Sequence, residues 1–261
     1  MEYKKYILIL FIALMIIPAG IFIEHISDKP AKLTQEEQKK YNEAIEKADE
    51  HVFFGEDEKT IDTLKEAEKI NPEDVQILYR LSSAQYNAKQ YEEAEKTFKK
   101  LESTERNNAN YWYLRAVNIS NIPENLTNIK LAVKYIEQCN KKAPVNYEKA
   151  PIELETEAKI YLQEYKYYRK LRTDDRLASK NEIAAKTKFL RVIDEFKNNR
   201  YTQNDTHWIN IRDDLYNQYI FFPNGNYKSP FENTPELEKF TPTQEDYEHW
   251  QELKNNMPKK N

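Results

Sequence analysis

Apolar residues recur at intervals of three and four along most of the chain, a pattern that predicts amphipathic helices. The clearest example is the stretch 71–101, where Leu78 and Leu81 are followed, after a short polar segment, by Ala94 and Phe98. This spacing places the apolar residues of each segment on one helical face. The stretch is therefore predicted to form two helices joined by a tight turn.

The spacing of the second predicted helix occurs three times. A small residue starts each occurrence and is followed four and seven positions later by residues suited to a helix interface: Thr60, Leu64 and Ala67; Ala94, Phe98 and Leu101; Ala132, Ile136 and Cys139. The starting residues are 34 and then 38 positions apart, and the surplus falls in residues 121–125, where a loop grows at small entropic cost. Such a period indicates stacked helical hairpins, because a single hairpin cannot bury its own apolar face.

These residues resemble the tetratricopeptide repeat (TPR), whose pattern places a large residue, Leu-Gly, Ala-x-x-x-Phe and Pro over 34 residues. The resemblance covers about residues 36–144 and extends to 198 on the similar spacing of Ala185, Phe189 and Val192. A capping-box pattern, Ser-Lys-Asn-Glu at residues 179–182, is expected to start the last of these helices.

The chain departs from the TPR pattern at several positions. Ala44 and Lys47 stand where the first repeat should carry a large residue and Leu, and Arg106 replaces a closing Pro. The positions of the consensus Gly hold Ser82 and Arg115. The first repeat is thus a degenerate match, and the middle repeat carries the resemblance.

A continuous apolar run of 18 residues, 6–23, precedes the repeats. At about 1.5 Å per residue it spans roughly 27 Å, close to the hydrocarbon thickness of a bilayer. Lys4 and Lys5 come before the run, so the positive-inside rule places the N-terminus in the cytoplasm. We expect an uncleaved signal anchor, a single-pass membrane protein and an extracytoplasmic C-terminal domain in a bacterial cell envelope. The alternatives are a signal peptide cleaved near residues 18–20 and an ordinary buried helix.

The expected fold is all-α: an N-terminal transmembrane helix, then an α-solenoid of three to four TPR-like helical hairpins, then C-terminal helices. Thr34 and Glu37 form a capping-box pattern at the start of the first repeat, and a last helix is expected to begin near Thr241. The expected segments are 1–23 (cytoplasmic N-terminus and anchor), 24–33 (linker), 34–144 (TPR repeats), 145–200 (a degenerate fourth hairpin) and 201–261 (C-terminal helices with a loop rich in Pro and Asn).

Composition argues against several functional classes. The net charge of −4 provides no basic surface for nucleic acid, and three glycines leave no Gly-rich phosphate loop. No catalytic motif occurs, and neither a metal nor a cofactor is expected, because the four histidines show no ligand spacing. The pairs His207-Trp208 and His249-Trp250 are interpreted as surface histidines beside core tryptophans. We therefore expect a binding protein and not an enzyme.

The resemblance also implies a binding groove, because the first helix of each TPR lines the concave face where ligands lie. The corresponding residues here are Ile45, Phe53, Tyr79, Arg80, Tyr86, Asn87, Trp112 and Ile119. Their aromatic and apolar character suits an amphipathic helix or an extended apolar peptide. The alternative is that the chain's own C-terminal helices cover these residues.

The expected function is a membrane-anchored TPR scaffold that recruits protein or peptide partners, a membrane protein complex among them, at the extracytoplasmic face. The alternative is a fixed structural subunit of a larger membrane-associated complex, with no free groove.

Overall fold

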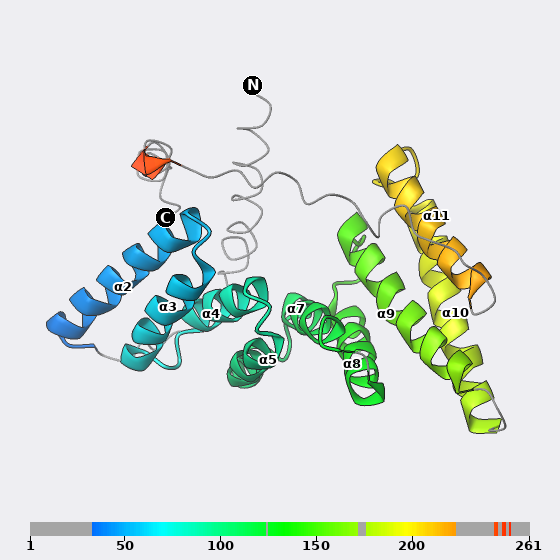
Figure 1. The fold of residues 1–261 in the computed structure, drawn as a ribbon, viewed down its shortest axis with the longest axis horizontal. Coiled ribbons are helices and arrows are strands. Elements are labelled where there is room, and N and C mark those ends of the chain that lie inside the picture. Colours follow the sequence, from blue (N-terminus) through cyan, green and yellow to red (C-terminus); the bar gives the residue numbers. More distant parts are fainter. Residues whose placement is uncertain are drawn as a thin grey trace. The chain divides into compact units, whose positions relative to one another are not determined.

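The computed structural model describes residues 33–123, 125–171, 176–222, 243, 244, 247, 248 and 251. This part of the chain contains helices and no strands, so the all-α prediction is confirmed there. The helices are α2 (Gln35–Phe53), α3 (Asp57–Ile70), α4 (Val75–Asn87), α5 (Tyr91–Lys100), α6 (Glu102–Glu105), α7 (Ala109–Ser120), α8 (Leu126–Lys142), α9 (Pro151–Lys170), α10 (Arg176–Asn198) and α11 (Thr206–Phe221) (Figure 1). The described residues form two compact units: the first contains α2 to α5 together with the described residues of the C-terminal segment, such as Tyr247, and the second contains α6 to α11.

The first unit contains two helical hairpins, α2/α3 and α4/α5, which stack through contacts between α3 and α4. Ala48, Ala67 and Ala94 are fully buried, and their small side chains let neighbouring helices approach closely. Larger apolar side chains such as Leu64 and Leu81 fill the remaining space. The alternation of small and large residues in the sequence is therefore the packing pattern of these hairpins.

The second unit contains two further hairpins, α7/α8 and α9/α10, which stack through α8 and α9. Helix α11 packs on α9 and α10. The core of this unit is rich in aromatic side chains, among them Tyr111, Tyr161, Phe189 and Phe196. The predicted fourth hairpin is thus present as α9 and α10.

Two predicted helix starts have different outcomes. The Thr34 capping box is confirmed: the Thr34 Oγ1 accepts the Glu37 N–H at 3.2 Å, and the Glu37 carboxylate accepts the Thr34 N–H at 2.9 Å. The capping box at Ser179 is wrong, because α10 already begins at Arg176 and Ser179 lies within the helix. Glu182 instead accepts a 2.9 Å hydrogen bond from Arg169 on α9.

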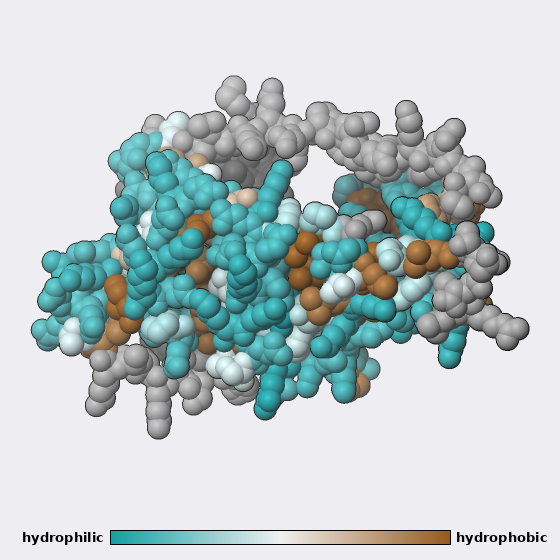
Figure 2. Space-filling model, turned by 60° about the horizontal axis from the view of Figure 1, so that its bottom comes forward, coloured by the Kyte–Doolittle hydropathy of each residue, from teal (hydrophilic) through white to brown (hydrophobic). Residues whose placement is uncertain are grey.

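The predicted membrane anchor, residues 6–23, lies outside the described residues. None of the helices that the structure does describe is long and apolar enough to cross a membrane. On the face shown in Figure 2, apolar residues form narrow strips among hydrophilic ones, as expected for a chain with 32 % charged residues.

Candidate functional site

Helices α2 and α4 are the first helices of the first unit's two hairpins, and five of the predicted groove residues on them remain accessible. Ile45, Tyr79, Arg80 and Tyr86 are half-buried, and Asn87 is exposed. We call these five residues the first-helix face. Half-buried aromatic and apolar side chains can contact a partner without any unfolding of the hairpins.

An ion pair joins α2 to α4 at this face. The Arg80 guanidinium donates to the Asp49 carboxylate, and both side chains are largely shielded from water. A charge-assisted hydrogen bond in such surroundings is stronger than an exposed one. Arg80 therefore holds the two first helices together, and a partner's carboxylate would have to compete with Asp49 for it.

A second contact between α2 and α4 involves the N-cap of α4. The Asp74 carboxylate accepts the Gln76 and Ile77 N–H groups at 2.8 and 3.1 Å and the Tyr41 hydroxyl at 2.5 Å. Burial, together with the neighbouring Asp74 carboxylate, raises the pKa of Tyr41, so the hydroxyl keeps its proton and remains a donor. This contact fixes the register of the two first helices.

The sequence did not lead us to predict the Tyr41–Asp74 and Asp49–Arg80 contacts, although a signal was available. Tyr41 and Asp74 are 33 positions apart, and Asp49 and Arg80 are 31 apart, which is close to one repeat. In a stacked array, residues one period apart lie on neighbouring hairpins. A search for complementary polar pairs at that separation would have found both contacts.

Phe53 lies at the end of α2 and is 7 % exposed. Its ring makes edge contacts with Phe54, at a centroid distance of 5.4 Å, and with Tyr247 from the C-terminal part of the chain, at 5.2 Å. The Tyr247 ring also lies 5.6 Å from Phe54. At this position the C-terminal segment does contact a predicted groove residue.

The two predicted groove residues in the second unit are buried. Trp112 is 7 % and Ile119 is 3 % exposed. The Trp112 indole N–H donates to the Arg106 carbonyl at 2.9 Å, and its ring lies 5.4 Å from that of Tyr135 on α8. Trp112 and Ile119 are thus placed in the interior, and a binding role for either stays a prediction.

Arg115 is a charged residue of this interior and is only 1 % exposed. Its guanidinium donates to the Tyr111 hydroxyl at 2.8 Å, to the Glu102 carboxylate at 3.0 Å and to the Tyr135 hydroxyl, and it lies 4.2 Å from the Tyr135 ring centroid. These contacts compensate for the loss of hydration on burial. Arg115, which stands where the TPR pattern has glycine, therefore links α7 to α8 through buried polar contacts.

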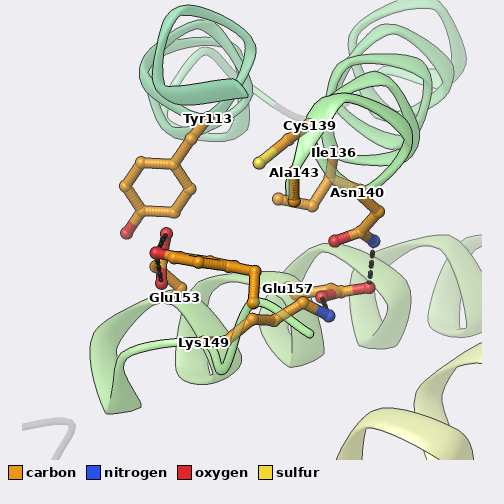
Figure 3. Close-up of a pocket in the computed structure, with 9 residues that line it drawn as sticks. Tyr113, Ile136, Cys139, Asn140, Ala143, Lys149, Glu153 and Glu157 are labelled. Atoms are coloured by element: carbon orange, nitrogen blue, oxygen red, sulfur yellow. Dashed lines mark hydrogen bonds and ion pairs between the residues drawn. The ribbon is translucent and has the colours of Figure 1, made fainter. Parts of the chain in front are cut away.

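A small pocket lies between α7, α8 and α9 (Figure 3). Glu157 on its wall is 0 % exposed and accepts hydrogen bonds from Lys149 at 2.6 Å and Asn140 at 2.8 Å. Burial raises the pKa of the Cys139 thiol in the same wall to about 12, so this cysteine is a poor nucleophile. The enclosed volume of about 10 Å³ holds no more than about one water molecule. The pocket is a narrow gap at which the Asn140–Glu157 hydrogen bond joins α8 to α9, and Lys149 in the loop before α9 pairs with Glu157.

Metal-ligating side chains do not converge in the described part of the chain, where no group of three or more His, Cys, Asp and Glu could hold a metal ion. His207 is exposed and lies edge-on to the half-buried Trp208 at 5.0 Å. His249 lies outside the described residues. The described hairpins therefore present surfaces for packing and hydrogen bonding with other molecules.

Comparison with known proteins agrees with this geometry. Residues 58–117, which include α4, α5 and α6, all but the first residue of α3 and most of α7, match the family model of the tetratricopeptide repeat. No curated protein and no solved structure matches the chain. The small and large interface residues, the stacked hairpins and the family match agree that residues 58–117 are built as tetratricopeptide repeats.

Proposed function

We propose that this chain is a membrane-anchored scaffold that recruits protein partners through the first-helix face of its repeats. TPR domains typically bind proteins, and a protein-interaction scaffold is what the family match supports. The anchor, the extracytoplasmic location and the recruiting role are our own inference from residues 6–23 and from the flanking Lys4 and Lys5.

The observation that carries the proposal is the character of the first-helix face. Tyr79 and Tyr86 are half-buried on α4, and Ile45 is half-buried on α2. The Asp49–Arg80 ion pair and the Tyr41–Asp74 hydrogen bond link the two helices. A rigid surface with large amphipathic side chains binds a partner at low entropic cost. A helix with one apolar face is the ligand class that such a surface fits.

Affinity capture from a detergent extract of membranes tests the proposal. The bait is the full chain, compared with a variant in which Tyr79 and Tyr86 are both alanine. Aromatic anchors often contribute about 2 kcal/mol or more each, so the variant should lose most of the captured partner. The matched control is Tyr201→Ala, an exposed tyrosine in the turn before α11, which should keep it. Equal capture by all three chains would refute the role of this face.

The same captures distinguish a scaffold from a fixed subunit. A scaffold yields partners that are substoichiometric and exchange with added extract. A fixed subunit yields one stoichiometric complex whose recovery is insensitive to Tyr79 and Tyr86.

Intact-mass measurement of the chain extracted from membranes tests the anchor separately. The proposal expects residues 1–20 to be retained. A mature chain that begins at or just after residue 21 would refute the anchor and indicate a cleaved signal peptide.

A further inference from the structure

The aromatic contact at the end of α2 is made by two parts of the chain that are almost two hundred positions apart. Tyr247 lies against both Phe53 and Phe54, at ring-centroid distances of 5.2 and 5.6 Å. Edge and tilted ring contacts at this distance are favourable beyond the apolar area that they bury. Tyr247 and Gln251 also belong to the same compact unit as α2.

Phe53 and Phe54 lie at a helix end whose backbone conformation is fixed by hydrogen bonds. Gly55 has φ of +68°, a conformation that ends the helix directly after the two phenylalanines. The N–H groups of Gly55 and Glu56 donate back to the carbonyls of Val52 and His51 at 3.1 and 2.9 Å. Phe53 and Phe54 therefore sit on a closed helix end and not on a free loop.

Tyr247, the other partner in this contact, lies in a hydrogen-bonded helical turn. The Tyr247 N–H donates to the Thr243 carbonyl at 3.2 Å, which is the spacing of a helical turn. The Gln251 amide donates to the Tyr247 hydroxyl at 2.7 Å from one turn further along. The tyrosine ring is thus presented from a helical turn, with its polar end satisfied by its own segment and its apolar face toward α2.

We propose that Phe53 and Phe54 form a docking site for an aromatic residue on a helical segment, and that the segment around Tyr247 is its resident intramolecular ligand. A partner helix with a comparable aromatic residue takes the site by displacing this segment. The displacement by a partner rests on the proposed function, whereas the intramolecular docking does not. Because Phe53 is one of the predicted groove residues, the C-terminal segment occupies one position that a partner was predicted to contact.

The physical consequence is competition within one chain. A tethered ligand acts at a high effective concentration and leaves the site open in only a fraction of the chains. The apparent affinity for a separate peptide is the affinity of the open site multiplied by that fraction. Weakening the tethered contact should raise that fraction and strengthen binding from outside.

A peptide titration tests this directly. A labelled peptide of residues 241–261 is titrated into the full wild-type chain and into the full Tyr247→Ala chain, with fluorescence anisotropy as the readout. Loss of two ring contacts should open the site, so the peptide should bind Tyr247→Ala about tenfold more tightly than wild type. Tyr216→Ala is the matched control, because Tyr216 is a half-exposed tyrosine on α11, and it should bind as wild type does.

A third variant establishes the location of the site. The double variant Phe54→Ala/Tyr247→Ala should bind the peptide at least tenfold more weakly than Tyr247→Ala does. Circular dichroism should show that its helix content is unchanged. Absence of peptide binding to Tyr247→Ala, or equal binding to it and to wild type, would overturn the proposal. Binding that is unaffected by Phe54→Ala would do so too. None of these outcomes requires a cellular partner, so a failure of the proposed recruiting function would be seen separately.

Discussion

Replacing Arg115 with methionine tests whether the buried guanidinium stabilises the second unit. Methionine keeps an unbranched chain of similar reach and removes the charge and all of its donors. The Tyr111 and Tyr135 hydroxyls would each lose a charged donor in a site from which water is excluded, whereas Glu102 is half-exposed and can be rehydrated. The change therefore removes interactions without an obvious steric conflict.

The expected cost follows from these contacts. A hydrogen bond to a charged group contributes about 1.5–3 kcal/mol, and two of them to buried hydroxyls are lost. A desolvated cation–π contact with the Tyr135 ring, 4.2 Å from the guanidinium carbon, adds about 1–2 kcal/mol. Methionine carries no charge that must be desolvated, which offsets part of this loss. We expect a net loss of about 3–5 kcal/mol in the free energy of unfolding of this unit, because two buried hydroxyls lose their charged donor.

Urea titration at neutral pH measures this cost, with circular dichroism for helix content and tryptophan fluorescence for the surroundings of Trp112. Arg200→Met is a matched control, because Arg200 also pairs with a glutamate, Glu148, and lies 4.6 Å from a tyrosine ring, but it is exposed. Exposed pairs contribute about 0–1 kcal/mol, so this variant should unfold almost as wild type does. A loss below about 1 kcal/mol for Arg115→Met, equal to that of the control, would refute the reasoning.

Three further predictions concern other buried groups. Ala94→Trp should lower the melting temperature measured by circular dichroism, because Ala94 is 0 % exposed and overpacking typically costs about 1–3 kcal/mol or more; an unchanged midpoint would contradict the assigned hairpin packing. Burial raises the pKa of Glu164, which Lys188 at 3.6 Å offsets only in part, so the folded state penalises ionisation and stability falls as the pH rises above the unfolded pKa. Glu164→Gln should therefore raise the melting temperature at pH 7 and change it little near about pH 3.5, and an equal effect at both pH values would contradict this. Cys139, whose thiol pKa is raised to about 12, should not react with a thiol reagent at pH 8 until urea is added, and fast labelling of the folded chain would contradict its burial.

The sequence pattern predicted the repeat hairpins because their packing depends on local spacing. In any TPR the positions of Ala94 and Phe98 face the partner helix of the same hairpin. The small and large residues at these positions therefore identify a hairpin without knowledge of the neighbouring hairpins. Helix starts were less predictable. A capping box such as that at Thr34 is decided locally, whereas the helix that contains Ser179 starts earlier, at Arg176. Glu182, which the pattern assigned to the cap, pairs with Arg169 on the neighbouring helix.

The candidate site was less predictable because burial depends on several elements together. The TPR pattern assigns Tyr79 and Trp112 to equivalent positions, yet Tyr79 is half-buried and Trp112 is 7 % exposed. The aromatic partner on α8 and the guanidinium of Arg115 enclose Trp112, and neither feature belongs to the repeat pattern. The Tyr247 contact with α2 joins distant parts of the sequence and could be stated from the sequence only as an alternative.

Site-specific photocrosslinking in intact membranes tests the central claim, recruitment of a protein through the first-helix face, most directly. A photoreactive phenylalanine analogue replaces Tyr79 in the full chain, and the matched control carries it at Tyr201 in the exposed turn before α11. We expect a discrete crosslinked protein from position 79 that is absent from position 201 and that decreases when Tyr86 is also replaced by alanine. Crosslinking from position 201 alone, or from neither position, would contradict the assignment of this face as the partner-binding surface.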